Sequence, residues 1–198
     1  MRRADVERFD RWADTYDRSF LQQRVFDPVH RAMMEALGPL GEERVLEVGC
    51  GTGTLTMALS ERARHAIGVD PAPRMVAIAA RKARGRSASF AVASAEELPF
   101  EDNAFGGAVA SMTLHHWADA GQGLAELARV LRPGGTLAIA DIDLPSPARW
   151  VLRRLGQSHA GWSRRELADF LYGAGFVAVR STSRGPISPK LPILVATR

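Results

Sequence analysis

Three glycines at alternating positions, set between an apolar run and a helical pattern, constrain the fold of this chain more than any other feature. The segment at residues 45–55 reads VLEVGCGTGTL. Its first half is rich in Val and Leu, as in a buried strand, and the chain continues through Leu55 and Leu59 with helical spacing. A strand that turns on glycines into a helix presents backbone N–H groups to a ligand. The segment therefore predicts an α/β fold with a binding site at this turn.

The glycine spacing excludes one common use of such a turn. A dinucleotide fingerprint, G-x-G-x-x-G, would need a further glycine where Thr54 or Thr56 stands. The pattern is instead acid-x-G-x-G-x-G, with Glu47 two residues before the first glycine. A carboxylate at the carboxyl end of a parallel strand suits a cationic group of a ligand.

A second apolar run also ends in an acid. Residues 65–70, HAIGVD, predict a strand that ends at Asp70, and Pro71 stops it. In nucleotide-binding α/β units an acid at this place holds ribose hydroxyl groups. The alternative is that Asp70 only caps the next helix. The occurrence of a glycine turn and an acid at βαβ spacing favours ribose binding.

These segments resemble the class I S-adenosylmethionine (SAM)-dependent methyltransferases, of the ubiquinone and menaquinone biosynthesis type (methyltransferase domain 11-like). The resemblance covers residues 7–141 well and the last quarter in outline. Beside the glycine turn it is carried by SAEELPFEDNAF at 94–105, LHH at 114–116 and LRPGGTL at 131–137. It implies a doubly wound, Rossmann-like α/β fold with a seven-stranded, mostly parallel sheet and helices on both faces. We expect one domain over 1–198, with lid helices in 1–40 and the α/β core in 44–198.

The resemblance also implies roles for individual residues. Glu47 would orient the ammonium group of the methionine end of SAM, and Asp70 would hold the ribose. Ser94 stands where the family has an acid that accepts the adenine amine, so Ala95 through its backbone and Glu96 are expected to contribute there. The other predicted cofactor-binding residues are Tyr16, Gly49, Cys50, Gly51, Thr52, Gly53, Pro71, Met75 and Ser111.

Two neighbouring histidines, His115 and His116, are the candidate catalytic residues, because the loop after the fourth strand should lie beside the sulfonium. Either one could serve as a general base, and the alternative is a structural role. The loop lacks the Asn/Asp-Pro-Pro-aromatic motif of amino-adenine methyltransferases, which argues against N6-adenine methylation of nucleic acid; no DNA partner is expected. No metal site is expected, because the acids and histidines lack ligand spacing.

The N-terminal segment predicts two helices. On the first, five residues fall on one face, and they either pack in the core or form a lid with Tyr16 near the methionine moiety; these are Phe9, Trp12, Ala13, Tyr16 and Phe20. The pair Tyr16-Asp17 resembles the lids of the same family. Asp27 is expected to cap the second helix, with Pro28 at its first position. The basic run at 81–86 is expected to be solvated.

The C-terminal quarter is patterned less clearly. Residues 144–162 are proline-rich, then basic and aromatic, which favours a packed helix with a solvated basic face over contact with a membrane surface. Ser163 and Glu166 predict a capping box. Residues 176–179 and 191–196 predict a terminal pair of strands, and the resemblance to the class I family implies that one of them is antiparallel.

Composition limits the setting. The chain has 198 residues, a formal net charge of +4 and a single cysteine, Cys50. One cysteine fits a reducing compartment, and neither a signal core nor a membrane-length apolar run is present, so we expect a cytoplasmic protein.

The predicted function is SAM-dependent methyl transfer to a small-molecule or lipid-like acceptor, with S-adenosylhomocysteine as the second product. The alternatives are a non-catalytic SAM-binding regulatory or partner protein, and a methyltransferase of RNA or protein, which the net charge suggests. The sequence carries no sign of its oligomeric state.

Overall fold

The described part of the structure, a computed structural model, is a single mixed β-sheet with helices on both faces; it comprises residues 1, 3–18, 26–142, 147, 150, 154, 161–182 and 193–198. The strand order is β3-β2-β1-β4-β5-β7-β6. The strands are β1 (Gly41–Val48), β2 (Ala63–Asp70), β3 (Ala88–Val92), β4 (Phe105–Ser111), β5 (Leu131–Ala140), β6 (Ala178–Thr182) and β7 (Ile193–Thr197). All neighbours are parallel except that β7 runs antiparallel to both β5 and β6. The predicted fold class is confirmed.

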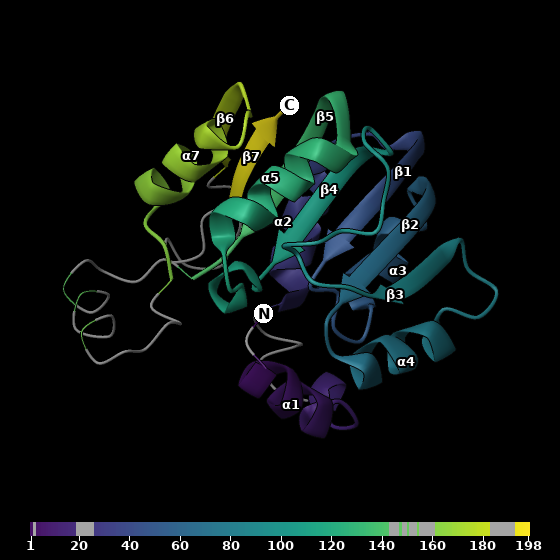
Figure 1. Cartoon of the computed structure of the whole chain (residues 1–198). Coiled ribbons are helices and arrows are strands. Elements are labelled where there is room, and N and C mark those ends of the chain that lie inside the picture. The colour runs from purple at the N-terminus through teal and green to yellow at the C-terminus, as the bar shows by residue number, and fades with distance from the viewer. Residues whose placement is uncertain are drawn as a thin grey trace.

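Helices cover both faces of the sheet. They are α1 (Arg3–Trp12), α2 (Asp27–Leu37), α3 (Thr54–Leu59), α4 (Pro73–Lys82), α5 (Ala120–Val130) and α7 (Arg164–Gly173), with short 3-10 turns η1 (Tyr16–Arg18) and η3 (Leu114–His116). Helices α5 and α7 lie on one face of the sheet, and α2 and α3 lie on the other (Figure 1). Buried leucines of α5 and α7 pack in one apolar cluster, and apolar residues of α2 and α3 pack in a second cluster. This layering gives each strand of the sheet centre an apolar environment on both sides.

The chain reverses its direction of winding between β1 and β4, which are neighbours in the sheet. In an open α/β sheet the loops on either side of such a switch point separate, and a crevice forms at the carboxyl ends of the strands. The loops after β1, β2 and β4 all emerge at this edge. It is therefore the place where the predicted site residues should meet.

Helix α1 docks beside α4. Its apolar residues Val6 and Phe9 pack with Ala13 and with Met75 of α4. The backbone N–H of Arg74 donates to Asp10 at 2.9 Å. The predicted apolar face is wrong at one position, since Trp12 is 48% exposed. Phe20 lies outside the described residues.

Several predicted boundaries were wrong. Asp27 is the first residue of α2 rather than its cap, because the backbone of Phe26 is already helical. β5 begins at Leu131, so the RPGG turn lies within the strand, where the pairing with β4 is irregular. β6 covers 178–182 instead of 176–179. The capping box of Ser163 and Glu166 is confirmed. Asp119 caps α5 by accepting from the N–H of Gln122.

Most of the proline-rich and basic segment at 144–162, and the predicted strand start at 191–192, lie outside the described residues. Of this segment, Trp150 is exposed, and the Arg154 guanidinium lies 4.7 Å from the centre of its ring. No helix in the described ranges has the length and apolar character needed to cross a membrane.

Candidate active site

Two adjoining open pockets lie at the carboxyl edge of the sheet. Both are lined by Tyr16, Gly49, Gly51, Ser111 and Met112. The first, here called the Glu47 pocket, is also lined by Phe26, His30, Glu47, Cys50, Thr52, Thr54 and Leu55. The second, the Asp70 pocket, is also lined by Met1, Phe9, Asp70, Met75, Thr113 and His116.

The glycine turn forms the common floor of the two pockets. Gly49 has a φ of +78°, and a Cβ atom there would lie 2.2 Å from the hydroxyl oxygen of Thr113. A side chain at this position would therefore push apart the loops after β1 and β4. At Gly51 the nearest atom to such a Cβ belongs to the ring of Tyr16, at 3.7 Å. Gly53 lies against Phe90 and lines neither pocket.

Asp70 organises this turn. One carboxylate oxygen accepts from the N–H of Gly51 at 2.9 Å, and the other accepts from the N–H of Ala72 at 2.9 Å. Burial raises the pKa of Asp70, and these two hydrogen bonds offset part of that rise. A carboxylate oxygen can accept more than one hydrogen bond, so Asp70 retains capacity for ligand hydroxyl groups.

Glu47 is 3% exposed and accepts a hydrogen bond from the hydroxyl of Thr56. Burial raises the pKa of Glu47 to about 8; the hydrogen bonds from Thr56 oppose this rise, and the charge of Asp70 adds to it. The carboxyl group is therefore mostly neutral near pH 7 until a cation approaches it. A buried acid of this kind in a pocket indicates a binding site for a positively charged group.

The end of β4 supplies two further signs of a ligand. The Ser111 hydroxyl is buried, lines both pockets and has no hydrogen-bond partner among the described residues. Met112 has a φ of +53°, a left-handed conformation that is strained for a side chain of this kind. Unpartnered polar groups and backbone strain gather at functional sites.

Tyr16 stands between the two pockets. Burial, together with the charges of Asp70, Glu47 and Asp17, raises the pKa of its hydroxyl to about 12. The hydroxyl thus keeps its proton at physiological pH and can donate to a ligand. The structure places Tyr16 over the glycine turn, as the lid interpretation expected, through η1 rather than through the first helix.

The two histidines have different surroundings. His115 Nδ1 lies 2.5 Å from a carboxylate oxygen of Asp141, and the second oxygen accepts from the His115 backbone N–H at 3.0 Å. His116 lines the Asp70 pocket, and its ring packs edge-on against Phe9 at 5.1 Å. His115 lines neither pocket. Asp141, at the end of β5, was not foreseen from the sequence.

Five predicted cofactor-binding residues line neither pocket: Gly53, Pro71, Ser94, Ala95 and Glu96. The Glu96 carboxylate accepts from the N–H of Ala118 at 2.7 Å and pairs with the Met1 ammonium at 3.2 Å. Glu96 thus joins the loop after β3 to the loop before α5. Its contact with adenine stays a prediction.

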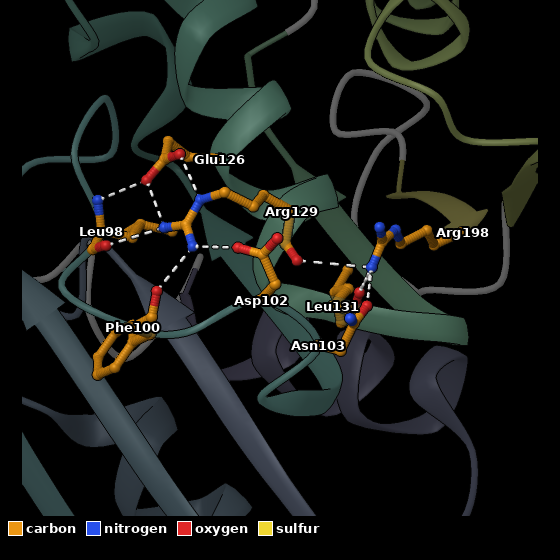
Figure 2. Close-up of polar contacts among 8 residues, drawn as sticks. All are labelled: Leu98, Phe100, Asp102, Asn103, Glu126, Arg129, Leu131 and Arg198. Atoms are coloured by element: carbon orange, nitrogen blue, oxygen red, sulfur yellow. Dashed lines mark hydrogen bonds and ion pairs between the residues drawn. The ribbon is translucent and has the colours of Figure 1, made fainter.

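The loop that carries these residues is fixed to α5 by Arg129. Figure 2 shows the guanidinium of Arg129 donating to the carbonyl oxygens of Leu98 and Phe100 and to the carboxylates of Asp102 and Glu126. The Glu126 carboxylate accepts in turn from the N–H of Leu98 at 2.8 Å. This cluster ties residues 98–102 to α5.

The basic run at 81–86 is not wholly solvated, contrary to expectation. Lys82, in the last turn of α4, donates to the Asp17 carboxylate at 2.8 Å and to the Thr52 carbonyl at 2.9 Å. The Thr52 hydroxyl donates to Asp17 at 2.5 Å. These contacts fasten η1 to the glycine turn, so the lid and the turn are held as one unit.

Sequence reasoning missed several pocket residues, among them Phe9, Phe26, His30, Met112 and Thr113 as lining groups. Phe26 and His30 come from the start of α2, and their ring centres lie 6.2 Å apart with nearly parallel planes. The apolar spacing of that helix pointed only to its buried face. The sequence did not point to Met112, because what distinguishes this residue is its positive φ angle, which is known only from the structure.

The sheet order, the glycine turn and the acid at the end of β2 define the class I methyltransferase fold. The chain belongs to the SAM-dependent methyltransferases: the family model described as "Methyltransferase domain" matches residues 46–139. A demethylmenaquinone methyltransferase of Clavibacter sepedonicus is 33% identical over 156 residues, covering 73% of this chain and 64% of the relative. An O-methyltransferase of Aspergillus nomiae is 33% identical over 162 residues, covering 77% and 72%.

A solved structure supports the same assignment. The SAM-dependent methyltransferase of Thermotoga maritima is 26% identical, with a TM-score of 0.66 over 96% of this chain and 97% of that one. The chain spans about half to two thirds of the length of several curated relatives that it matches.

Proposed function

We propose that this protein binds SAM and transfers its methyl group to a small-molecule or lipid-like acceptor. The observation that carries the proposal is one continuous edge on which two buried acids, Glu47 and Asp70, and the unpartnered Ser111 hydroxyl surround the glycine turn. Membership of the methyltransferase family agrees with it.

The residues present fit SAM group by group. The cofactor carries an ammonium group, a carboxylate, a ribose diol and an adenine ring. Glu47 suits the ammonium group by charge, and Asp70 suits the diol as an acceptor. The Ser111 hydroxyl lies between the two pockets, where it can bond to the methionine portion. Met75 and Phe9 give the Asp70 pocket an apolar wall for the nucleoside.

The proposed methyl transfer requires little covalent chemistry from the protein itself. SAM supplies a methyl group already activated by its sulfonium, which an acceptor displaces in line while the electron pair of the broken bond stays on sulfur. The chain's own contribution is to position the reactants and to exclude water. Tyr16, Phe9 and the glycine turn enclose the site from the side of α1.

A proton must leave most acceptors during transfer. If the Nδ1 proton of His115 is directed to Asp141, the imidazole is held with Nε2 as its basic nitrogen. His116 lies nearer to the Asp70 pocket. The two histidines stay the candidate general bases, with Asp141 as the positioning residue of the first.

The class of acceptor is inferred from the relatives. One is named a demethylmenaquinone methyltransferase, and this name denotes a small, lipid-like acceptor. Another is named an O-methyltransferase, and this name is compatible with a small acceptor. Transfer to RNA or protein ranks lower, and a non-catalytic SAM-binding role is the remaining alternative. The protein is expected to act in the cytoplasm as a single domain.

The test is transfer of label from methyl-labelled SAM in a cell extract, followed by partition between organic solvent, water and precipitated macromolecules. Label in organic or water-soluble small molecules, lost with Asp70→Ala, would support the proposal. Label in precipitated macromolecules would replace it with the RNA or protein alternative. Tight SAM binding without transfer in any extract would favour the non-catalytic role.

A further inference from the structure

We propose that Asp5 of α1 is a positioning residue for His116, so that docking of the N-terminal helix completes the general base of the site. The inference rests on the proposed methyl transfer and deepens it, because it chooses between the two histidines. No sequence pattern pointed to Asp5 as a functional residue.

Helix α1 contacts the imidazole of His116 in two places. The Asp5 carboxylate lies 3.8 Å from His116 Nδ1. The Phe9 ring meets the imidazole edge-on, with 5.1 Å between the ring centres. Asp5 and Phe9 are four residues apart, so they lie on the same face of the helix. Since only 8% of the Asp5 side chain and 12% of the His116 side chain are exposed, the carboxylate acts on the imidazole largely away from water.

His116, rather than His115, is placed to meet an acceptor. His116 lines the Asp70 pocket, whereas His115 lines neither pocket. The Nδ1 atom of His115 is held by the Asp141 carboxylate at 2.5 Å. The two imidazole rings are neighbours, with 4.1 Å between their centres. We therefore assign proton removal to His116, against which the fixed ring of His115 packs.

The two oxygens of the Asp5 carboxylate face different partners. One lies 3.1 Å from the guanidinium of Arg8, on the same helix, and the other is the oxygen nearest to His116. Arg8 thus holds the carboxylate in place while its second oxygen faces the imidazole. Other titratable groups at this pocket are Asp70, Tyr16 and the Met1 amino group, which pairs with Glu96.

A carboxylate beside Nδ1 prepares an imidazole to act as a base. It favours the tautomer with the proton on Nδ1, which leaves the lone pair of Nε2 to take a proton. As the acceptor forms its bond to the methyl carbon, the electron pair of the broken C–S bond stays on sulfur. The acceptor's proton passes to Nε2 of His116, and Asp5 stabilises the resulting imidazolium. The distance of 3.8 Å is longer than a hydrogen bond, and catalytic contacts of this kind often tighten only in the reacting complex.

The first test is the rate of label transfer from saturating methyl-labelled SAM in a cell extract. Asp5→Ala should slow transfer at least about tenfold, and Asp5→Glu should restore part of the rate. The dissociation constant of S-adenosylhomocysteine should change less than about twofold in both variants, because Asp5 lines neither pocket. Glu7→Ala is the matched control, since Glu7 is an acid of the same helix that pairs with the exposed Arg3.

The second test needs no acceptor. Nuclear magnetic resonance of the imidazole nitrogens, with S-adenosylhomocysteine bound and the ring neutral, should find the His116 proton on Nδ1 in the wild type. In Asp5→Ala it should move to Nε2, and His116→Gln identifies the signals.

Three outcomes would overturn the role of Asp5: an unchanged tautomer, an unchanged transfer rate, or a loss of S-adenosylhomocysteine affinity as large as the loss of rate. The last would show that Asp5 serves only to dock the helix. A wild-type protein that binds S-adenosylhomocysteine but transfers no label to any fraction would instead overturn the proposed function, and the tautomer would still decide whether Asp5 positions the ring.

Discussion

Near pH 7 the buried carboxyl group of Glu47 holds a proton in the folded chain, whereas an unfolded chain releases it. The pKa in the folded protein is about 8, against an ordinary value of 4.5. Between these two values the folded state binds more protons than the unfolded state, so the free energy of unfolding falls as pH rises. At pH values above the folded-state pKa of about 8, Glu47 is ionised in both states, so its effect on the free energy of unfolding no longer changes with pH. Glu47 thus lowers stability at the pH at which it would bind a cation.

The first prediction concerns Glu47→Gln, which keeps the hydrogen bond with Thr56 but cannot ionise. The variant should melt several degrees above the wild type at about pH 8 and close to it at about pH 4.5, because only the wild type loses stability in between. Thermal unfolding at the two pH values measures the difference. Glu61→Gln, at an exposed ion pair with Arg86, is the control. An equal difference at both pH values would refute the assignment of the pKa.

The second prediction concerns Asp70. Asp70→Ala removes the acceptor for the N–H of Gly51 and the proposed acceptor for the ribose, so SAM should bind at least about tenfold more weakly. Calorimetry measures the dissociation constant, and the melting temperature reports damage to the turn itself. Asp70→Asn, which keeps one acceptor oxygen, should lose less stability. An unchanged dissociation constant for Asp70→Ala would remove this residue from the site.

At the scale of elements, α1 and η1 are joined to the core mainly through α4. The ion pair of Lys82 with Asp17 is partly shielded from water, and Lys82 also donates to the Thr52 carbonyl. Partial burial makes such a contact stronger than an exposed pair. The lid is therefore coupled to the glycine turn, and whatever opens the lid should also loosen the turn.

The third prediction tests this coupling with Lys82→Met, which keeps the length of the side chain and removes its charge. S-Adenosylhomocysteine should dissociate several-fold faster, and proteases should cleave the chain at η1 more readily. Stopped-flow dissociation and limited proteolysis measure the two effects. Arg86→Met removes an exposed ion pair nearby and should change dissociation less than about twofold. Similar effects of both variants would show that dissociation depends on surface charge alone and not on the contacts of Lys82 with Asp17 and Thr52.

The sequence predicted those parts of the site that are local in the chain. The glycine turn and the acid after β2 are short patterns in which strand, turn and helix follow one another, so Glu47, Gly51 and Asp70 were found. His30 and Met112 were not found, because they join the pocket only through the packing of α2 and the end of β4. Their importance depends on neighbours far away in sequence.

Element boundaries show the same limit. The predicted seven-stranded, mostly parallel sheet is confirmed. Alternating strands and helices leave few possible arrangements, which is why the fold class could be predicted. The start of β5 at Leu131 was missed because Pro133 and Gly134 are typical of a turn, and only pairing with β4 and the chain end extends the strand there. Asp27 looked like a cap, but the residue before it had already adopted helical geometry.

At the scale of the whole molecule, the site joins the two halves of the sheet. Glu47 and Asp70 belong to the half formed by β1, β2 and β3, whereas Ser111 ends β4 in the other half and Met112 follows it. Helix α1 adds a third contact through Phe9 and His116. A ligand that touches all of these groups would hold both halves and the lid together, so its binding energy should appear as stability of the entire fold.

The last prediction follows from this arrangement. S-Adenosylhomocysteine at about 100 times its dissociation constant should add about 2.7 kcal/mol to the free energy of unfolding. For a chain of this size that corresponds to a rise of about 5 to 10 °C in the melting temperature. Because the contacts are buried, the rise should persist from about 50 to about 500 mM salt, whereas nucleic-acid binding would weaken steeply over that range. Differential scanning fluorimetry at the two salt concentrations measures it, with Asp70→Ala as the control that should show little rise. A rise that disappears at high salt would indicate that the ligand is held by exposed charges, and it would place the cofactor outside the two pockets.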